Sequence, residues 1–122
     1  MILLPQSVKV YVATAPANLR KSFEGLSNEV RSVLALDPLS GHLFLFLNRR
    51  RTQVKMLLFT RGGFTIVHKR LERGRFTFPT QVMPGAMRVE IEAHELSALL
   101  EGLEPSTASA ARRWTPLFAT AR

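Results

Sequence analysis

The chain has 122 residues, of which 46% are hydrophobic and 21% charged, a composition typical of one compact globular domain. It contains no cysteine, which excludes disulfide frameworks and thiolate metal sites and favours a reducing, cytoplasmic location. Its apolar runs are too short to span a bilayer, and its first residues lack the charged start and long apolar stretch of a signal peptide. We therefore expect a cytoplasmic protein that makes no contact with a membrane.

Positive charge is concentrated in one part of the sequence. The net charge is +8, and residues 48–75 hold nine of the 17 cationic residues but one anion, Glu72. The rest of the chain is neutral overall. Because a local excess creates a directional field, it predicts a preferred docking side. The nine cations are Arg49, Arg50, Arg51, Lys55, Arg61, Lys69, Arg70, Arg73 and Arg75.

Arginine dominates lysine in this basic stretch, which favours planar, bidentate contact with phosphate or carboxylate. The nine cations are therefore candidate nucleic-acid-binding residues, with DNA as the expected partner. Two alternatives remain open at this point. The same cations can pair with an acidic protein surface, or they can form a solvated face that serves only solubility.

The first third of the chain predicts a strand, a helix and a turn. Residues 7–13 alternate between apolar and polar side chains, as in a half-buried strand. Asn18 is predicted to be the N-cap of an amphipathic helix that runs from Leu19 to Leu34. Residues 37–41 have the proline, serine and glycine typical of a turn.

The middle of the chain predicts three strands joined by short turns, at residues 42–47, 53–59 and 64–71. Gly62 and Gly63 can supply the positive φ angles of a tight hairpin. Connections of this length join antiparallel neighbours, so we expect an antiparallel meander.

A short strand at residues 87–91 and a second amphipathic helix at 93–103, with Gly102 near its end, complete the predicted elements. They indicate an α+β fold in which two amphipathic helices pack on an antiparallel meander sheet. Residues 1–103 form the predicted domain. The composition then becomes small and polar, so residues 104–122 are predicted to be a flexible tail.

Four phenylalanines accompany the basic stretch. Phe44 and Phe46 share one strand face, and Phe76 and Phe78 share another. Exposed rings of this kind stack on unpaired bases in single-strand binders, but a sheet covered by two helices needs large apolar residues. We therefore assign these rings to the core and the arginines to phosphate contact. No helix is predicted to present side chains to base edges, so we expect little sequence readout.

The sequence offers no catalytic set, and we expect a non-enzymatic protein without cofactor or metal. Its single aspartate, Asp37, lies in a turn, whereas strand-transfer and nuclease sites hold two metal ions between several carboxylates. No glycine-rich phosphate loop is present. The histidines, His42, His68 and His94, are scattered, and nothing supplies a third ligand to a pair of them. A metal-dependent nuclease is thus the weakest of the functions considered.

Several separate blocks of sequence resemble the small Orf2-like protein of the insertion sequence 66 family of transposable elements, which is often labelled TnpB. They occur in the same order and at matching spacing. The blocks are LRKSFEGL at 19–26, DPLSGHLF at 37–44, NRRR at 48–51, VKML at 54–57, KRLERGRF at 69–76 and LSALLEGL at 96–103.

The resemblance implies an accessory role in transposition, beside a larger transposase and another small protein of the same element. It carries over no catalytic residues. The chain departs from the family pattern at residues 57–63, where LLFTRGG makes the turn more basic. Two functions follow as hypotheses: DNA binding through the basic stretch, or docking on the element's transposase.

Overall fold

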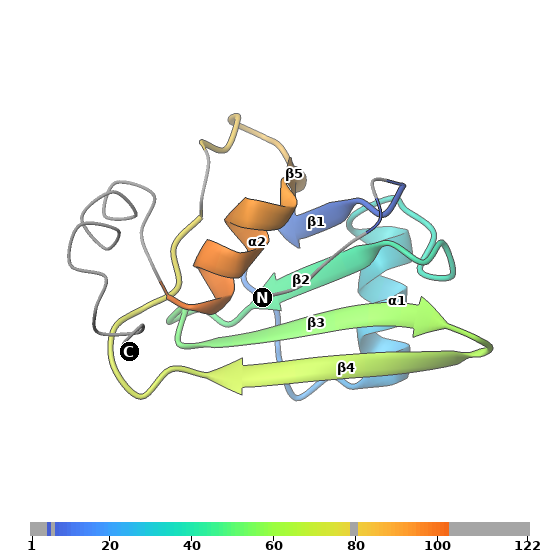
Figure 1. Ribbon diagram of the computed structural model, residues 1–122, viewed down its shortest axis with the longest axis horizontal. Coiled ribbons are helices and arrows are strands. Elements are labelled where there is room, and N and C mark those ends of the chain that lie inside the picture. Colours follow the sequence, from blue (N-terminus) through green and yellow to red (C-terminus); the bar gives the residue numbers. More distant parts are fainter. Residues whose placement is uncertain (1–4, 6, 79–80, 103–122) are drawn as a thin grey trace.

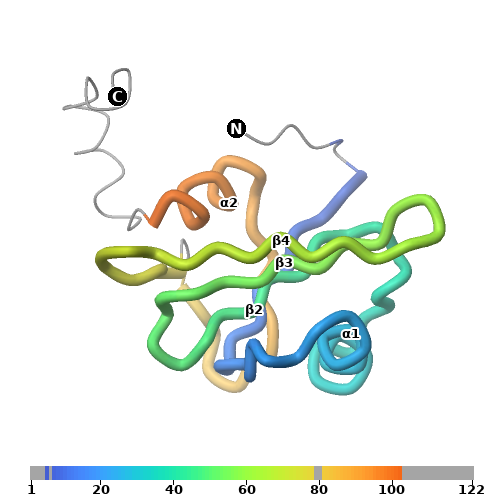
Figure 2. The backbone as a smooth tube through the Cα atoms, turned by 90° about the horizontal axis from the view of Figure 1, so that it is seen from below, coloured from blue at the N-terminus to red at the C-terminus, as the bar shows by residue number. Residues whose placement is uncertain are grey.

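The structure is a computed structural model, and it describes residues 5, 7–78 and 81–102. These residues form a five-stranded mixed sheet in the order β4-β3-β2-β1-β5 (Figure 1). The sheet lies between two helices, with α2 on one face and α1 on the other (Figure 2). The strands are β1 (Val10–Ala13), β2 (Leu43–Leu47), β3 (Gln53–Thr60), β4 (Gly63–Arg70) and β5 (Arg88–Ile91), and the helices are α1 (Phe23–Ser32) and α2 (Ala93–Leu100).

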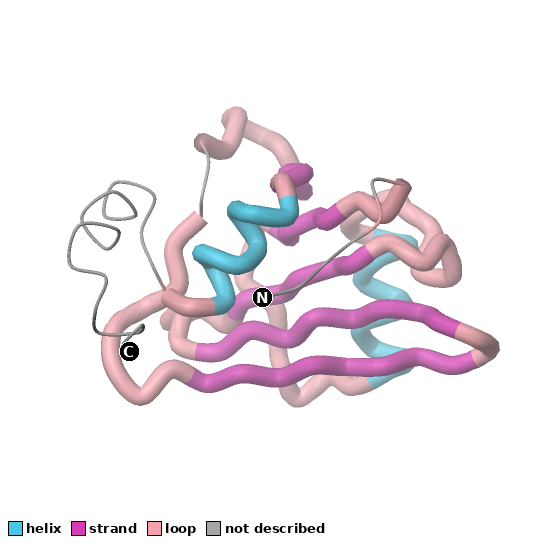
Figure 3. The backbone as a smooth tube through the Cα atoms, viewed as in Figure 1, coloured by secondary structure: helices cyan, strands magenta, loops and turns pink. Residues whose placement is uncertain are grey.

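The predicted antiparallel meander is confirmed for β2, β3 and β4, which follow one another across the sheet (Figure 3). Leu45 pairs with Met56, and Met56 pairs in turn with Val67. Short connections explain this order, because a tight turn returns the chain antiparallel to the strand it has just left.

The prediction of a wholly antiparallel sheet is wrong at β1. This strand runs parallel to β2, with Val10 opposite Leu43, and β5 pairs with its other edge in the antiparallel direction. The physical reason is the helix between the two strands. Because α1 crosses the sheet face and returns the chain to the end where β1 began, β2 must start in the same direction.

The predicted start of the first helix is also wrong. Helix α1 begins at Phe23 with Ser22 as its N-cap residue, four residues after the position of Asn18. The Asn18 side-chain oxygen instead accepts a hydrogen bond from the Arg20 backbone N–H at 3.0 Å. Asparagine forms such local turns as readily as it caps helices, so the sequence pattern fits both.

Strand β2 is buried along its whole length because the two helices cover opposite faces of the sheet. Alternate side chains therefore enter two separate cores. One core contains Leu43, Leu45 and Leu47 with Leu96 and Leu99 of α2, and the other contains Phe44 and Phe46 with Leu26 and Val30 of α1.

Helix α2 ends at Leu100 rather than at residue 103, and its end is fixed to the sheet. Gly102 has a φ of 79° and donates a backbone hydrogen bond to the Leu99 carbonyl at 2.9 Å. A Cβ at this glycine would come within 3.3 Å of Leu71, so both the conformation and the space favour glycine. Lys69 of β4 donates from its ammonium group to the Leu100 carbonyl, a favourable position for a cation.

The predicted flexible tail, residues 104–122, lies outside the described residues. Among those that are described, neither helix has the length and apolar character needed to cross a bilayer.

The two cores predict two independent sensitivities to truncation. Leu26→Ala in α1 and Leu96→Ala in α2 should each lower the free energy of unfolding by about 2–5 kcal/mol, because each leaves a cavity in a fully buried site. Met83→Ala, at a side chain that is 73% exposed, should change it by less than about 0.5 kcal/mol. Denaturant unfolding measures all three. A negligible effect of either leucine change would show that its helix does not close a core.

Candidate nucleic-acid interface

Most of the candidate cations lie at one end of the sheet. The β2–β3 turn, residues 48–52, and the segment that follows β4, residues 71–77, lie side by side there (Figures 1 and 3). Arg61 is different, because it belongs to the β3–β4 turn at the opposite end of the hairpin. An eight-residue strand rises about 3.3 Å per residue, so roughly 25 Å of β3 separates Arg61 from the other turns.

Two backbone hydrogen bonds hold these segments together. The Leu71 N–H donates to the Thr52 carbonyl at 2.8 Å, and the Phe76 N–H donates to the Arg51 carbonyl at 2.6 Å. The sheet thereby continues past β4 as an irregular extension that brings two arginine-bearing turns into contact. We call the exposed cations on them the basic end: Arg49, Arg50, Arg51, Arg73 and Arg75.

Asn48 organises the β2–β3 turn, although it is not one of the predicted site residues. Its side-chain oxygen accepts hydrogen bonds from the backbone N–H groups of Thr52 and Gln53, at 2.9 and 3.0 Å. Its amide group donates to the Thr52 hydroxyl at 3.1 Å. An asparagine placed directly before three arginines and a threonine is a signal for such a turn, since its side chain imitates a backbone hydrogen bond.

The remaining candidates are held elsewhere or are partly neutralised. Lys55 points to the α1 face, where its half-buried ammonium group donates to the Lys21 carbonyl at 2.9 Å. Lys69 is bonded to the end of α2. Arg70 forms an exposed ion pair with Glu72 at 3.3 Å. The structure therefore brings five of the nine predicted cations together on the two turns and places Lys55 and Arg61 apart from them. Lys69 and Arg70 stand beside these turns at the end of β4, but they are bonded to Leu100 and Glu72.

The charge of the basic end is not neutralised by carboxylates of the described residues. The ion pairs recorded there are Lys21–Glu29 and Arg70–Glu72, and neither includes one of the five arginines. The surface is an open hollow of about 700 Å³, lined chiefly by Arg49, Arg50, Arg51, Arg75 and Thr77. An open, uncompensated cationic hollow attracts anions and leaves room for an extended one.

The predicted placement of the aromatic rings holds for three of them. Phe44, Phe46 and Phe76 are buried, with exposed fractions of 1% or less. Phe78 is only half-buried, and the Arg51 guanidinium carbon lies 5.2 Å from the centre of its ring. This cation–π contact joins the two segments through side chains as well as through the backbone.

The histidines of the sheet serve local contacts. His42 accepts a hydrogen bond from the Lys9 backbone N–H at its Nδ1 atom, and its ring meets Tyr11 edge-on. His68 Nε2 lies 2.8 Å from the Gln53 side-chain oxygen. Desolvation lowers the pKa of His68, with smaller contributions from the positive charges of Lys55 and Arg70, which favours the uncharged ring. Within the described ranges, no three potential ligands are placed to hold a metal ion.

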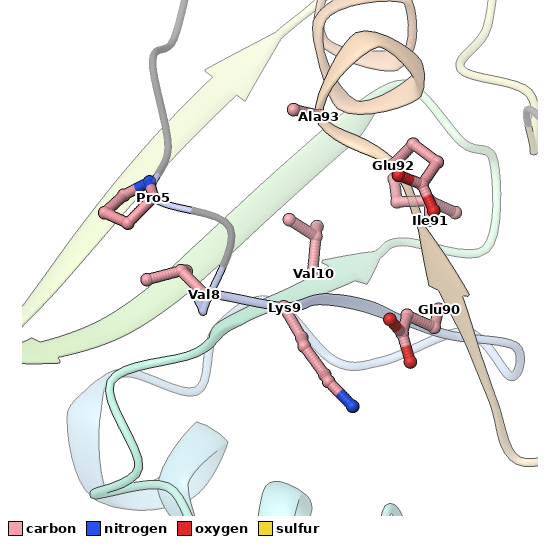
Figure 4. Close-up of a pocket in the computed structure, with 8 residues that line it drawn as sticks. All are labelled: Pro5, Val8, Lys9, Val10, Glu90, Ile91, Glu92 and Ala93. Carbon is pink, nitrogen blue, oxygen red and sulfur yellow. The ribbon is translucent and has the colours of Figure 1, made fainter.

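A second hollow, of about 410 Å³, lies between β1, β5 and the start of α2, far from the arginine turns in the sequence (Figure 4). Its charged residues have opposite signs, which gives it no concentrated field. Exposed Glu92 is the N-cap residue of α2, and its backbone N–H donates to the Glu95 carboxylate. The lining consists of Pro5, Val8, Lys9, Val10, Glu90, Ile91, Glu92 and Ala93.

The described residues thus define a small α+β protein with one cationic end. The chain belongs to the IS66 Orf2 like protein family, which matches residues 8–110. It is accordingly an Orf2-like accessory protein of IS66 insertion sequences. No solved structure matches it.

Two curated relatives come from Sinorhizobium fredii (strain NBRC 101917 / NGR234). The chain is 37% identical to "Uncharacterized protein y4hO" over 99 residues, which cover 81% of this chain and 84% of the relative. It is 34% identical to "Uncharacterized protein y4jC" over 104 residues, covering 85% and 86% of the two chains. The similarity therefore extends over most of each protein.

Loss of the asparagine contacts should destabilise the arginine turn. Asn48→Ala removes a side chain that satisfies two backbone donors, so it should lower the free energy of unfolding by about 1–3 kcal/mol. Asn28→Ala is the matched control, because Asn28 is exposed on α1 and its side chain accepts one long bond from Arg31. Chemical denaturation compares the two variants. Equal losses would mean that Asn48 has no special role in the turn.

Proposed function

We propose that this accessory protein binds DNA through phosphate contacts of the basic end and leaves strand cleavage to the transposase. One observation carries the proposal. Five exposed arginines lie on two turns that backbone hydrogen bonds hold side by side, and no carboxylate of the described residues pairs with them. Salt screens the field of these arginines beyond the Debye length of about 8 Å. Most of the attraction therefore comes from phosphates that lie in close contact with the surface.

The chemistry of the cations supports phosphate as the target. A guanidinium group presents several donors in one plane and binds phosphate oxygens in pairs. The hollow beside Arg49 and Arg75 is open rather than enclosed, which suits an extended backbone better than a small free anion. The basic end consists of turns, so no described helix enters a groove from it, and contact with base edges in a duplex is expected to be slight.

The absence of catalysis is part of the proposal. Metal-assisted phosphoryl transfer requires several carboxylates around two ions. Near the arginine turns the described segment offers Glu72, which already pairs with Arg70. Asp37 lies in another turn, where its side chain accepts a hydrogen bond from the Leu39 backbone. These residues support a binding role rather than a cleaving one.

Salt dependence of DNA binding tests the location of the site. For duplex DNA the logarithm of the binding constant falls with the logarithm of salt by about 0.9 for each neutralised phosphate. If Arg49 and Arg50 each contact one, the double variant R49Q/R50Q should reduce the slope by about 1.8. Fluorescence anisotropy of a labelled duplex, titrated at several salt concentrations, gives the slope directly.

The control removes the same net charge from elsewhere. Arg31 is exposed on α1 and Arg61 lies at the opposite end of the β3–β4 hairpin, so R31Q/R61Q should leave the slope nearly unchanged. An equal fall of the slope in both double variants would show that DNA is attracted to the net charge of the protein and not to the basic end. Wild-type protein that binds no DNA at low salt would refute the proposal as a whole.

Docking on the transposase, or on the other small protein of the element, is the second candidate. It is favoured by exposed apolar side chains in the loop before β5, namely Val82, Met83 and Met87. Hydrogen bonds from Thr14 to the carbonyls of Ala86 and Met87 attach this loop to β1. Anchored apolar side chains are typical of protein contacts, where they supply area that phosphate binding does not use.

Co-purification distinguishes the two candidates. A complex with the transposase that survives nuclease treatment, and that Met83→Ser weakens while R49Q/R50Q does not, would support docking through the loop. Loss of the complex on nuclease treatment would show that DNA bridges the two proteins, which agrees with the first candidate and argues against direct docking.

A further inference from the structure

One aromatic ring beside the basic end is only partly buried in the core. Phe78 packs against the α2-side core but remains half-buried, whereas Phe76, two residues earlier, is fully buried. The Arg51 guanidinium lies over the Phe78 ring, with its central carbon 5.2 Å from the ring centre. The ring covers one face of the planar guanidinium group and thereby fixes the orientation of that plane.

The backbone also fixes the position of Arg51. Its φ is 59°, in the left-handed region that side-chain-bearing residues seldom occupy, and its carbonyl accepts the hydrogen bond from the Phe76 N–H. A conformation of this kind persists only where the surroundings enforce it, and such positions concentrate at binding sites. The Arg51 side chain is thus preorganised by its own backbone and by Phe78, which reduces the entropy lost when a ligand is bound.

A small hollow of about 170 Å³ opens beside this pair. Its lining includes Pro16, Leu47 and Phe78 on the apolar side, and Arg49 and Arg51 on the cationic side. It is smaller than the roughly 300 Å³ at which pockets for drug-sized ligands begin, and it suits one flat group. Arg49 and Arg51 also line the larger open hollow, so the two depressions adjoin.

We propose that the basic end takes up an unpaired nucleobase, which stacks on the Arg51 guanidinium held against Phe78 while the flanking phosphates occupy the larger hollow. The inference rests on the proposed DNA-binding function and names the kind of DNA: a single strand, or a duplex that carries an unpaired base. Bases in an intact duplex keep both faces covered by their neighbours, whereas unpaired bases stack on arginine planes and aromatic rings.

The stacking predicts a preference that charge alone cannot give. Wild-type protein should bind a duplex with one unpaired base more tightly than the same duplex without it, at equal salt. Stacking of one base on such a platform corresponds to a gain of about 5-fold or more in affinity. With 2-aminopurine as the unpaired base, binding should quench its fluorescence, which reports stacking directly.

Two conservative variants isolate the stack. Arg51→Lys keeps the charge and loses the plane, and Phe78→Leu keeps an apolar side chain and loses the ring. Each should abolish the preference and the quenching. Affinity for the intact duplex should fall no further in Arg51→Lys than in Arg50→Lys, because each of these variants loses one guanidinium group of the basic end. Arg50→Lys is the matched control, because it makes the same change at the neighbouring arginine, and it should keep both the preference and the quenching.

The outcomes separate this inference from the proposed function. Equal affinity of the wild-type protein for the two duplexes overturns the base-stacking site, even when duplex binding still depends on Arg49 and Arg50. So does an equal effect of Arg51→Lys and Arg50→Lys on the preference and the quenching. Failure to bind any of the DNA probes overturns the proposed function itself. Arg51→Lys alters an exposed side chain, so it decides the question even if Phe78→Leu lowers stability.

Discussion

Burial of β2 on both faces is the constraint on which the rest of this structure depends. A strand packed under α1 on one side and α2 on the other must be apolar at every position, and its neighbours must supply apolar side chains to both layers. Charged side chains are then excluded from β2 itself, and most of the cations of residues 48–75 gather where the strands end, whereas Lys55 of β3 reaches the Lys21 carbonyl beside α1. The arginine turn follows β2 directly, so the most buried strand of the sheet also holds the most basic turn in place.

Much of the fold could be predicted from alternation and helical spacing. The meander from β2 to β4 and the short helix α2 follow from local patterns, and their bounds differ from prediction by a few residues at most. The parallel pairing of β1 with β2 was missed, although a helix between two strands implies it. Asn18 could not be assigned from sequence, because one side chain serves turns and helix caps alike and only the register of the helix decides.

The location of the candidate site could be predicted in outline, but the prediction did not identify which of the cations belong to it. Strand length alone separates Arg61 from Arg49 and its neighbours, and alternation along β3 directs Lys55 toward α1. Both facts lay within reach of the sequence. The contact between Arg51 and Phe78 could not be predicted, because it depends on how an irregular segment crosses a neighbouring turn. Residue type alone favours burial for every phenylalanine. The sequence shows that positive charge is concentrated in residues 48–75, but only the folded structure shows in which direction these side chains point.

The outer strand β4 has a further consequence for how this protein behaves at high concentration. Among the described residues no strand pairs with its outer edge, and edges of this kind favour open-ended aggregation. Lys69 and Arg70 stand at adjacent positions of this strand. A second copy added in parallel register would place like charges on top of each other along the growing assembly. Repulsion between these like charges therefore disfavours such stacking of copies through β4.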